Sequence, residues 1–233
     1  MLLAEALAAG ADVRTVFVEP SGRSHQVVLD ASRAGVEVRE VQEGALGKVL
    51  DVVNPQAVVS VVGAASTELP AVMGAAARSS RPVLVLVSIQ DPGNAGTLVR
   101  VAEAAGCAGL VLTEHSVDVH NPKTVRATAG AVFRLPVVEG VTADAVQAAA
   151  TGAGIPTWAM VRADGVAPED ADLAAACVLF VGSEAHGLPD EVRDSADGRL
   201  SIPMEGAAES LNAAVAGALV AFEAARQRRR RDR

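Results

Sequence analysis

Short runs of Val and Leu alternate along the chain with Ala-rich stretches that favour helix. This alternation is typical of an α/β protein whose sheet is mostly parallel. The runs Val83–Ile89 and Val178–Gly182 are almost entirely apolar, as expected for strands that are covered on both faces. We therefore expect two fully buried strands at these positions.

The remaining elements follow the same alternation. The predicted strands are Val13–Val18, Val36–Val41, Ala57–Gly63, Val83–Ile89, Gly109–Thr113, Ile155–Val161, Val178–Gly182 and Leu200–Pro203. The predicted helices are Ser24–Ala34, Ala45–Val52, Ala95–Ala105, Pro122–Gly130, Thr142–Gly152 and Glu209–Arg229. The last of these is long and Ala-rich, and Gly217 is its only glycine, which favours a continuous helix.

A domain boundary is expected between Gly63 and Pro82, where small and polar residues replace the apolar runs. We predict a small α/β domain over residues 1–64, a linker over 65–81 and a larger domain over 82–233. The chain opens in a helix-like stretch with no strand before it, so the small domain is expected to be short at its N-terminus. Six of the last eight residues are Arg, which predicts a basic tail.

Composition narrows the class of protein. Half of the 233 residues are hydrophobic but only 2% are aromatic, so the core must consist of Val, Leu, Ile and Ala. Cys107 and Cys177 lie far apart in apolar runs and are expected to be reduced core residues of a cytoplasmic protein. Neither a CxxC motif nor a His/Cys cluster suggests a metal. No apolar stretch reaches the ~20 residues of a membrane helix, and the N-terminus does not resemble a signal peptide.

The formal net charge is −8, which taken alone argues against a nucleic-acid partner. The distribution of charge matters more than its total, however. The acidic residues are scattered along the chain, whereas the arginines gather at its end.

The first of three polar clusters, Gln90–Arg100, follows a buried strand and opens a helix. In open α/β sheets, ligands bind at this end of the strands. Arg100 comes six residues after Asn94, so both side chains are expected to face one crevice from the first helical turns. An ordinary strand–helix turn with a surface arginine is the alternative.

The second cluster, Leu179–Pro189, is a hydrophobic strand that ends in a Gly-rich loop containing Glu184. Glycines let the backbone approach a ligand closely. A loop with a solvated glutamate is the alternative. His186 in this loop invites a role as general base, because histidine is the residue type best suited to proton transfer near neutral pH, but the sequence offers it no partner.

The third cluster begins where a strand ends at Pro203 and continues into a helix start with Glu209, Ser210 and Asn212. Helix N-termini offer unpaired N–H groups to a ligand. Simple helix capping, by Ser210, is the alternative. The chain contains neither GxxxxGK[ST] nor GxGxxG in a strand–helix context, and the spacing of its residues indicates no Ser-His-Asp or Cys-His arrangement.

Each cluster alone is weakly specific, but their order and spacing together resemble the three motifs of the SpoU (TrmH-like) RNA 2′-O-ribose methyltransferase family, within the SPOUT superfamily. The matching patterns are Asn94-x-Gly96-x-x-x-Arg100, Gly182-Ser183-Glu184-x-x-Gly187, and Ile202-Pro203-Met204 followed by Ser210-Leu211-Asn212. The segment Asn121–Ala131 is also similar to that family. The resemblance covers roughly Val83 to Gln227.

The resemblance implies an α/β methyltransferase domain with a deep trefoil knot near its C-terminus, which nothing in the periodicity would reveal. It implies S-adenosylmethionine as cofactor, bound bent in the knot, and a homodimer whose active site is shared across the interface. It also implies that the small N-terminal domain is a ribosomal-protein-like domain that binds the RNA substrate. Since the small domain is expected to be short at its N-terminus, we expect it to lack some of the RNA contacts of that family.

The roles implied by the resemblance are carried over motif by motif. The cofactor positions are Val181, Gly182, Ile202, Met204 and Leu211, and the catalytic positions are Asn94, Arg100, Glu184, Ser210 and Asn212. Arg100 matches the arginine thought to activate the ribose hydroxyl. Lys123, Arg126 and Arg134 are the expected RNA contacts besides the tail, since phosphate contacts come mainly from Arg and Lys. For Arg126, capping of a loop or pairing with a carboxylate is the alternative.

Three hypotheses of function remain at this point. The first is 2′-O-methylation of ribosomal RNA, with transfer RNA as the variant. The second is a catalytically silent RNA-binding or ribosome-assembly factor that keeps the fold. The third is methylation of a base by a related knotted enzyme.

Overall fold

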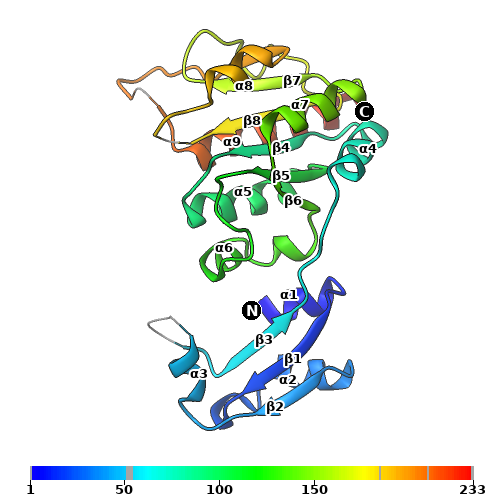
Figure 1. Cartoon of the computed structure of the whole chain (residues 1–233), viewed down its shortest axis with the longest axis vertical. Helices are drawn as coiled ribbons and strands as arrows, with labels where there is room; N and C mark the ends of the chain where they lie inside the picture. The colour runs from blue at the N-terminus through cyan, green and yellow to red at the C-terminus, as the bar shows by residue number, and fades with distance from the viewer. Residues whose placement is uncertain (1, 51–54, 184, 209, 232–233) are drawn as a thin grey trace. The chain divides into compact units, whose positions relative to one another are not determined.

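The computed structural model describes residues 2–50, 55–183, 185–208 and 210–231. The chain divides into two compact units, Met1–Ala65 and Ser66–Arg233 (Figure 1). The first unit ends one residue beyond the small domain predicted over residues 1–64. The expected linker over 65–81 is wrong, because helix α4 (Leu69–Ser79) occupies most of it and packs on the sheet of the second unit.

The small unit is a three-stranded sheet with helices. Its elements are α1 (Leu2–Ala8), β1 (Val13–Val18), α2 (Gln26–Arg33), β2 (Glu37–Glu40), α3 (Ala45–Val49) and β3 (Val58–Val62). The strands lie in the order β2-β1-β3, with β1 parallel to β2 and antiparallel to β3. Leu3, Val16, Val18, Val27 and Val28 form its core, so α1 and α2 cover the sheet through their apolar sides.

The large unit is built on six strands. After α4 its elements are β4 (Val83–Val87), α5 (Pro92–Ala104), β5 (Gly109–Thr113), α6 (Pro122–Ala127), β6 (Val137–Val141), α7 (Ala143–Gly152), β7 (Thr157–Val161), β8 (Val178–Gly182), α8 (Asp190–Ser195), β9 (Gly198–Ser201) and α9 (Ala213–Arg231). The order is β6-β5-β4-β8-β7-β9, and all neighbouring strands are parallel. The predicted parallel α/β sheet is confirmed.

Both faces of this sheet are covered by helices, which explains the continuous apolar runs. On one face, Leu84 and Leu86 of β4 belong to a core that includes residues of α5 and α9. On the other face, Val83 and Val85 belong to a core that includes residues of α4 and α7. Successive residues of a strand point to opposite faces, so every residue of β4 is buried.

The core has the predicted composition. Phe180 is its one aromatic residue among the largest fully buried side chains, and Leu, Ile and Val supply the others. Cys107 and Cys177 are free and buried. Burial raises the pKa of both thiols to about 12, so both stay protonated near neutral pH. Among the described residues, no helix is both long and apolar enough to span a bilayer.

Several boundaries differ from the predicted ones for local reasons. Strand β4 stops before Ser88, whose φ of 53° leaves the extended region. Helix α6 ends at Ala127, because Ala129 and Gly130 both take positive φ. Helix α9 begins at Ala213, since the side chain of Asn212 accepts the N–H groups of the first turn.

Strand β6 and helix α8 were not predicted. In β6 the pair Glu139-Gly140 breaks the apolar run, and a register shift against β5 shows an irregular ladder at this point. Helix α8 has only six residues, too few for helical periodicity to be visible in the sequence.

The strand order has a switch point between β4 and β8. The chain leaves β4 towards β5 and leaves β8 towards the far edge strand β9, although β4 and β8 are neighbours. Ligands of open parallel sheets bind at such a switch point, outside the carboxyl ends of the strands.

Candidate active site

A cavity of about 460 Å³ opens at the carboxyl ends of β7, β8 and β9 and at the start of α9. The five predicted cofactor positions all line it: Val181, Gly182, Ile202, Met204 and Leu211. Ser210, from the predicted catalytic set, lines it as well. The second and third polar clusters of the sequence therefore meet in one pocket.

Gly182 ends β8 in a position that no side chain can occupy. A Cβ built on it would lie 2.2 Å from the carbonyl carbon of Gly187 and 2.4 Å from the nitrogen of Leu188. The N–H of Gly187 donates to the carbonyl of Ser183 at 2.8 Å, and Gly187 has a φ of 69°. The loop after β8 thus folds back on the strand end and presents backbone to the cavity. Glu184 of this loop lies outside the described residues.

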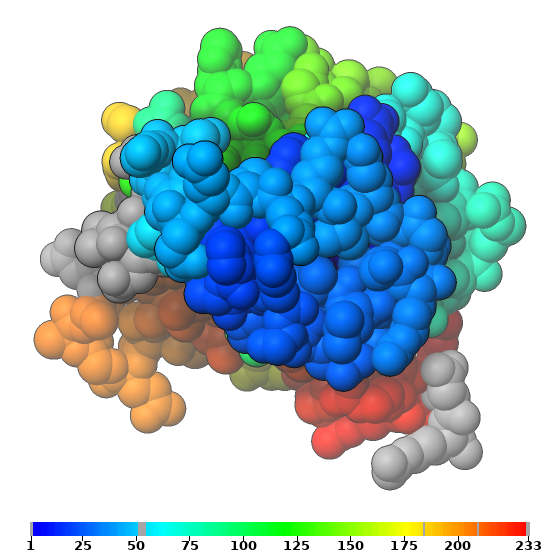
Figure 2. Space-filling model, turned by 90° about the horizontal axis from the view of Figure 1, so that it is seen from below, coloured from blue at the N-terminus to red at the C-terminus, as the bar shows by residue number. Residues whose placement is uncertain are grey.

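The third cluster supplies apolar walls to the same cavity. Val181 is buried, Ile202 and Leu211 are half-buried, and Met204 is 37% exposed. Residues 203–208 are exposed throughout and stand out from the surface as the orange segment of Figure 2. The cavity therefore combines an apolar lining with open backbone groups, as small-molecule sites commonly do.

The starts of α5 and α9 meet beside this cavity. The side-chain amide of Asn212 donates to Oδ1 of Asn94 at 3.0 Å. Asp91 caps α5 by accepting the N–H of Asn94 at 2.7 Å. Further along, a Cβ on Gly217 would lie 2.6 Å from Cδ2 of Leu98, so this glycine lets α9 pack closely on α5. The first cluster is thereby joined to the third.

Arg100 differs from the other predicted catalytic residues. It lies in the middle of α5, about 9 Å along the helix axis from Asn94, and its side chain is exposed. It does not line the cavity. Within residues 2–50, 55–183, 185–208 and 210–231, its guanidinium has no hydrogen bond or ion pair. Asn94 does not line the cavity either, so the expectation that Asn94 and Arg100 face one crevice is not met at this cavity.

Several polar side chains of the cavity were missed by the sequence analysis. Arg162 and Asp164 follow β7, and Arg193 and Arg199 come from α8 and β9. Asp164 has a φ of 60°, unusual for a residue other than glycine. The rule that ligands bind beyond the carboxyl ends of strands could have found Arg162 and Asp164. Arg199 belongs to β9, but the strand predicted here began one residue after it, at Leu200. The sequence pattern therefore did not mark Arg199 as a residue of the site. His186 also lines the cavity.

Helix α6 carries two of the three predicted RNA contacts. Asn121 caps it by accepting the N–H of Lys123 at 2.9 Å, and Lys123 and Arg126 are exposed. The helix lies against α5, because a Cβ on Gly96 would come within 2.5 Å of Cβ of Ala127. No larger residue therefore fits at Gly96.

Arg134 lies elsewhere. It precedes β6, at the amino-terminal edge of the sheet, and its Nε lies 2.9 Å from Oε1 of Glu103. The structure thus separates Arg134 from Lys123 and Arg126.

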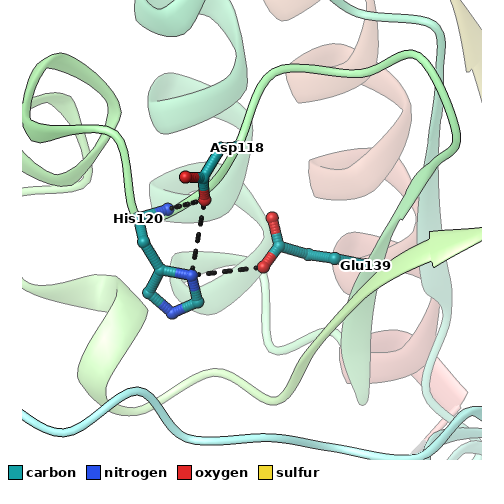
Figure 3. Close-up of side chains that lie close together, drawn as sticks. All are labelled: Asp118, His120 and Glu139. Atoms are coloured by element: carbon teal, nitrogen blue, oxygen red, sulfur yellow. Dashed lines mark hydrogen bonds and ion pairs between the residues drawn. The ribbon is translucent and has the colours of Figure 1, made fainter.

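Three exposed side chains tie the loop before α6 to β6 (Figure 3). Nδ1 of His120 lies 3.3 Å from Glu139 Oε2 and 3.5 Å from Asp118 Oδ1. Glu139 also accepts the N–H of Val119 at 2.8 Å. Among the described residues these are the one trio of potential metal-ligating groups within 4.8 Å of one another. These contacts account for the arrangement of the three side chains. They hold in place the loop that leads to Asn121, the N-cap of α6.

Comparison with known proteins gives a consistent result. Residues 81–222 match the model of the SpoU rRNA Methylase family. The chain is 33% identical over 224 residues to the 23S rRNA (guanosine-2′-O-)-methyltransferase RlmB of Xanthomonas axonopodis pv. citri, covering 93% of this chain and 90% of that protein.

Solved structures are similar over nearly the whole chain. An AdoMet-bound rRNA methyltransferase from Sinorhizobium meliloti has a TM-score of 0.83 and 32% identity, covering 97% of this chain and 84% of that one. The SpoU methyltransferase AviRb from Streptomyces viridochromogenes, in complex with AdoMet, has a TM-score of 0.84 and 29% identity, covering 97% and 87%. Because the family model matches more than half of the chain, and because the second and third motif loops line one cavity, the chain belongs to the SpoU rRNA methylase family.

Proposed function

We propose that the protein transfers a methyl group from S-adenosylmethionine to a ribose 2′-hydroxyl of ribosomal RNA. The observation that carries this proposal is the convergence of the second and third motif loops on one cavity, with the first motif tied to the third by the Asn94–Asn212 hydrogen bond. Relatives named as 23S rRNA 2′-O-methyltransferases, similar over most of the chain, support the substrate class.

The residues of the cavity fit this cofactor. Val181, Ile202 and Leu211 provide an apolar slot for an adenosyl group, and the glycine turn at Gly182 exposes backbone donors and acceptors. The volume of about 460 Å³ lies in the range of small-molecule pockets. When bound, the cofactor supplies a sulfonium-activated methyl group.

The protein must hold the hydroxyl oxygen in line with that methyl group, and such positioning contributes up to ~7–11 kcal/mol. Arg100 steadies the negative charge that develops on the ribose oxygen. Arginine is a permanent cation in proteins, so electrostatic stabilisation suits it better than the role of a base. Asn94 and Asn212 tie the starts of α5 and α9 together, and Ser210 lines the cavity. For Glu184, a role in orienting polar groups rests on the motif alone.

The protein acts as a homodimer. Helix α9 exposes Val215, Leu219 and Phe222, each 45–49% exposed, at a spacing of four and three residues that puts them on one side of the helix. Three large apolar side chains in one stripe favour burial against a second copy. Because Arg100 lies outside its own chain's cavity, a site completed across the dimer accounts for its position.

The C-terminal segment forms a trefoil knot. The chain passes from the interior strand β8 to the edge strand β9, then returns so that α9 packs against α5 and β8. Gly217 of α9, whose Cβ would lie 2.6 Å from Leu98 and 3.6 Å from Val181, marks this return.

RNA is held by Lys123 and Arg126 beside the site and by the small unit, Met1–Ala65, as a substrate-binding domain. We place the protein in the cytoplasm, where its two free cysteines stay reduced.

Calorimetry with S-adenosylmethionine, combined with transfer of a tritiated methyl group to ribosomal and transfer RNA, tests the proposal. It predicts cofactor binding and label in ribosomal RNA. Tight cofactor binding without transfer to any RNA would instead support a silent ribosome-assembly factor, and label in transfer RNA alone would change the substrate.

A further inference from the structure

A second cavity, of about 510 Å³, lies at the opposite edge of the large sheet. It is formed by the ends of α4 and α5 and by the residues that precede β5 and β6. Strand β4 has five residues of about 3.3 Å each, so roughly 15 Å separate this edge from the methyl-transfer site. The second cavity is therefore a separate feature of the unit.

Its charged lining is basic. Arg78, Arg81 and Arg134 line it together with one carboxylate, Glu103. Glu103 pairs with Arg134 at 2.9 Å. In the part of the chain that the structure describes, the guanidinium groups of Arg78 and Arg81 form no ion pair or hydrogen bond. Two positive charges thus face the cavity without a counterion, in a chain whose net charge is −8.

The end of α9 adds further positive charge at the same edge. Nη2 of Arg228 donates to the carbonyl of Ala105 at 2.8 Å, which holds the helix end against the end of α5. Its Nη1 is buried and has no partner among the described residues. Burial lowers the pKa of Arg228, and the charges of Arg81 and Arg229 act in the same direction. These cations are therefore close enough to repel one another.

The negative charge at the C-terminal ends of the helices offsets only part of the positive charge at this edge. The C-terminus of a helix carries about half a negative charge, which suits Arg228 on the last carbonyls of α5. Three such ends, from α4, α5 and α9, together with Glu103 amount to roughly two and a half negative charges. Arg78, Arg81, Arg134 and Arg228 alone bring four positive charges to this edge, so a positive excess remains.

We propose that this surface, formed by Arg78, Arg81, Arg134 and the Arg-rich end of α9, is a second RNA-binding site that contacts the phosphate backbone of the substrate away from the modified nucleotide. The inference rests on the proposed RNA substrate. Clustered arginines around a cavity are the chemistry that binds phosphate groups, whatever the RNA sequence. Because the surface is remote from the reaction, it contributes to affinity only for RNA that is large enough to reach both edges.

The test is the salt dependence of RNA binding by the double variant Arg78→Gln/Arg81→Gln, with transcribed 23S rRNA and a short oligonucleotide as probes. Each lost phosphate contact should reduce the slope of log K against log salt by roughly 0.7–0.9. We expect a shallower slope and about ten-fold weaker binding of the long RNA at low salt, with unchanged binding of the oligonucleotide and of S-adenosylmethionine.

The charge-preserving variant Arg78→Lys/Arg81→Lys should behave like the wild type, and Glu103→Gln should bind long RNA more tightly. An unchanged salt slope in the glutamine variant would overturn the inference. So would a loss of affinity for long RNA in the lysine variant as large as that in the glutamine variant, or polyglutamate that competes with the labelled RNA as effectively as unlabelled RNA does. If the wild type binds RNA with this salt response but transfers no methyl group, the proposed activity fails and the binding surface stands.

Discussion

Asn212 donates a hydrogen bond from its side-chain amide to Oδ1 of Asn94, 118 residues away in the chain. The same Asn212 accepts the N–H groups of Ala214 and Val215 through its own Oδ1. One side chain therefore caps α9 and ties its start to the start of α5. The bond joins the first and third motifs beside the cavity that Leu211 and Ala213 line.

The two roles of Asn212 can be separated by substitution. Asn212→Asp keeps an oxygen to cap α9 but loses the donor to Asn94, whereas Asn212→Ala loses both. We expect Asn212→Asp to stay within about 0.5 kcal/mol of wild-type stability and Asn212→Ala to lose about 1 kcal/mol as a lost cap. Both should weaken cofactor binding about five-fold, as the loss of one hydrogen bond would. Urea unfolding measures the stability, and calorimetry measures the cofactor affinity. Equal cofactor affinity in the wild type and both variants would show that the Asn94–Asn212 hydrogen bond does not support the cofactor site.

Gly182→Ala is expected to destroy the cofactor site. The new methyl group would lie within 2.4 Å of backbone atoms of Gly187 and Leu188, so the loop after β8 must move. We expect a loss of at least about ten-fold in cofactor affinity and about 1–3 kcal/mol of stability. Gly206→Ala is the matched control, because a Cβ there meets no atom within 4 Å. Normal cofactor binding by Gly182→Ala would contradict the assignment of this loop.

Arg100→Ala should separate catalysis from binding. The side chain is exposed and lies outside the cavity, so its removal should leave the fold and the cofactor affinity nearly unchanged. If Arg100 stabilises charge in the transition state, kcat should fall by about 10²–10³-fold. Single-turnover methyl transfer is the measurement, with Arg100→Lys retaining part of the activity. A rate like that of the wild type would exclude Arg100 from the mechanism.

Leu219→Glu/Phe222→Glu should give a monomer. Two carboxylates in the apolar stripe of α9 would be desolvated in a dimer, which costs several kcal/mol per interface. Light scattering should report half the wild-type mass, and circular dichroism should show an intact fold. The control is Leu29→Glu, an equally exposed leucine on α2. A monomeric wild type, or a dimer that survives both substitutions, would refute the proposed interface.

The sequence predicted the parallel sheet because its strands are buried on both faces and so leave continuous apolar runs, as at Val83–Val87. It missed β6, where Glu139 and Gly140 interrupt the run, and α4, whose small residues resemble a linker. Local patterns do not record that Val72 of α4 packs closely over Gly109.

The candidate site was predictable where a motif follows a strand, as at Gly182 and Ile202. It was not predictable where a residue enters the cavity from the side, as Arg199 of β9 and Arg193 of α8 do. The position of Arg100 outside the cavity also could not be inferred, because spacing along a helix gives the direction of a side chain only relative to its own axis.

The central claim is that the three loops form one methyl-donor site serving a ribose hydroxyl. The most direct test is to treat ribosomal RNA from a strain lacking this protein with the purified enzyme and S-adenosylmethionine, and then to map the product by alkaline cleavage and nucleoside mass spectrometry. We expect one position that resists alkali and yields a 2′-O-methylated nucleoside. A methyl group on a base, with alkaline cleavage intact at every position, would contradict it.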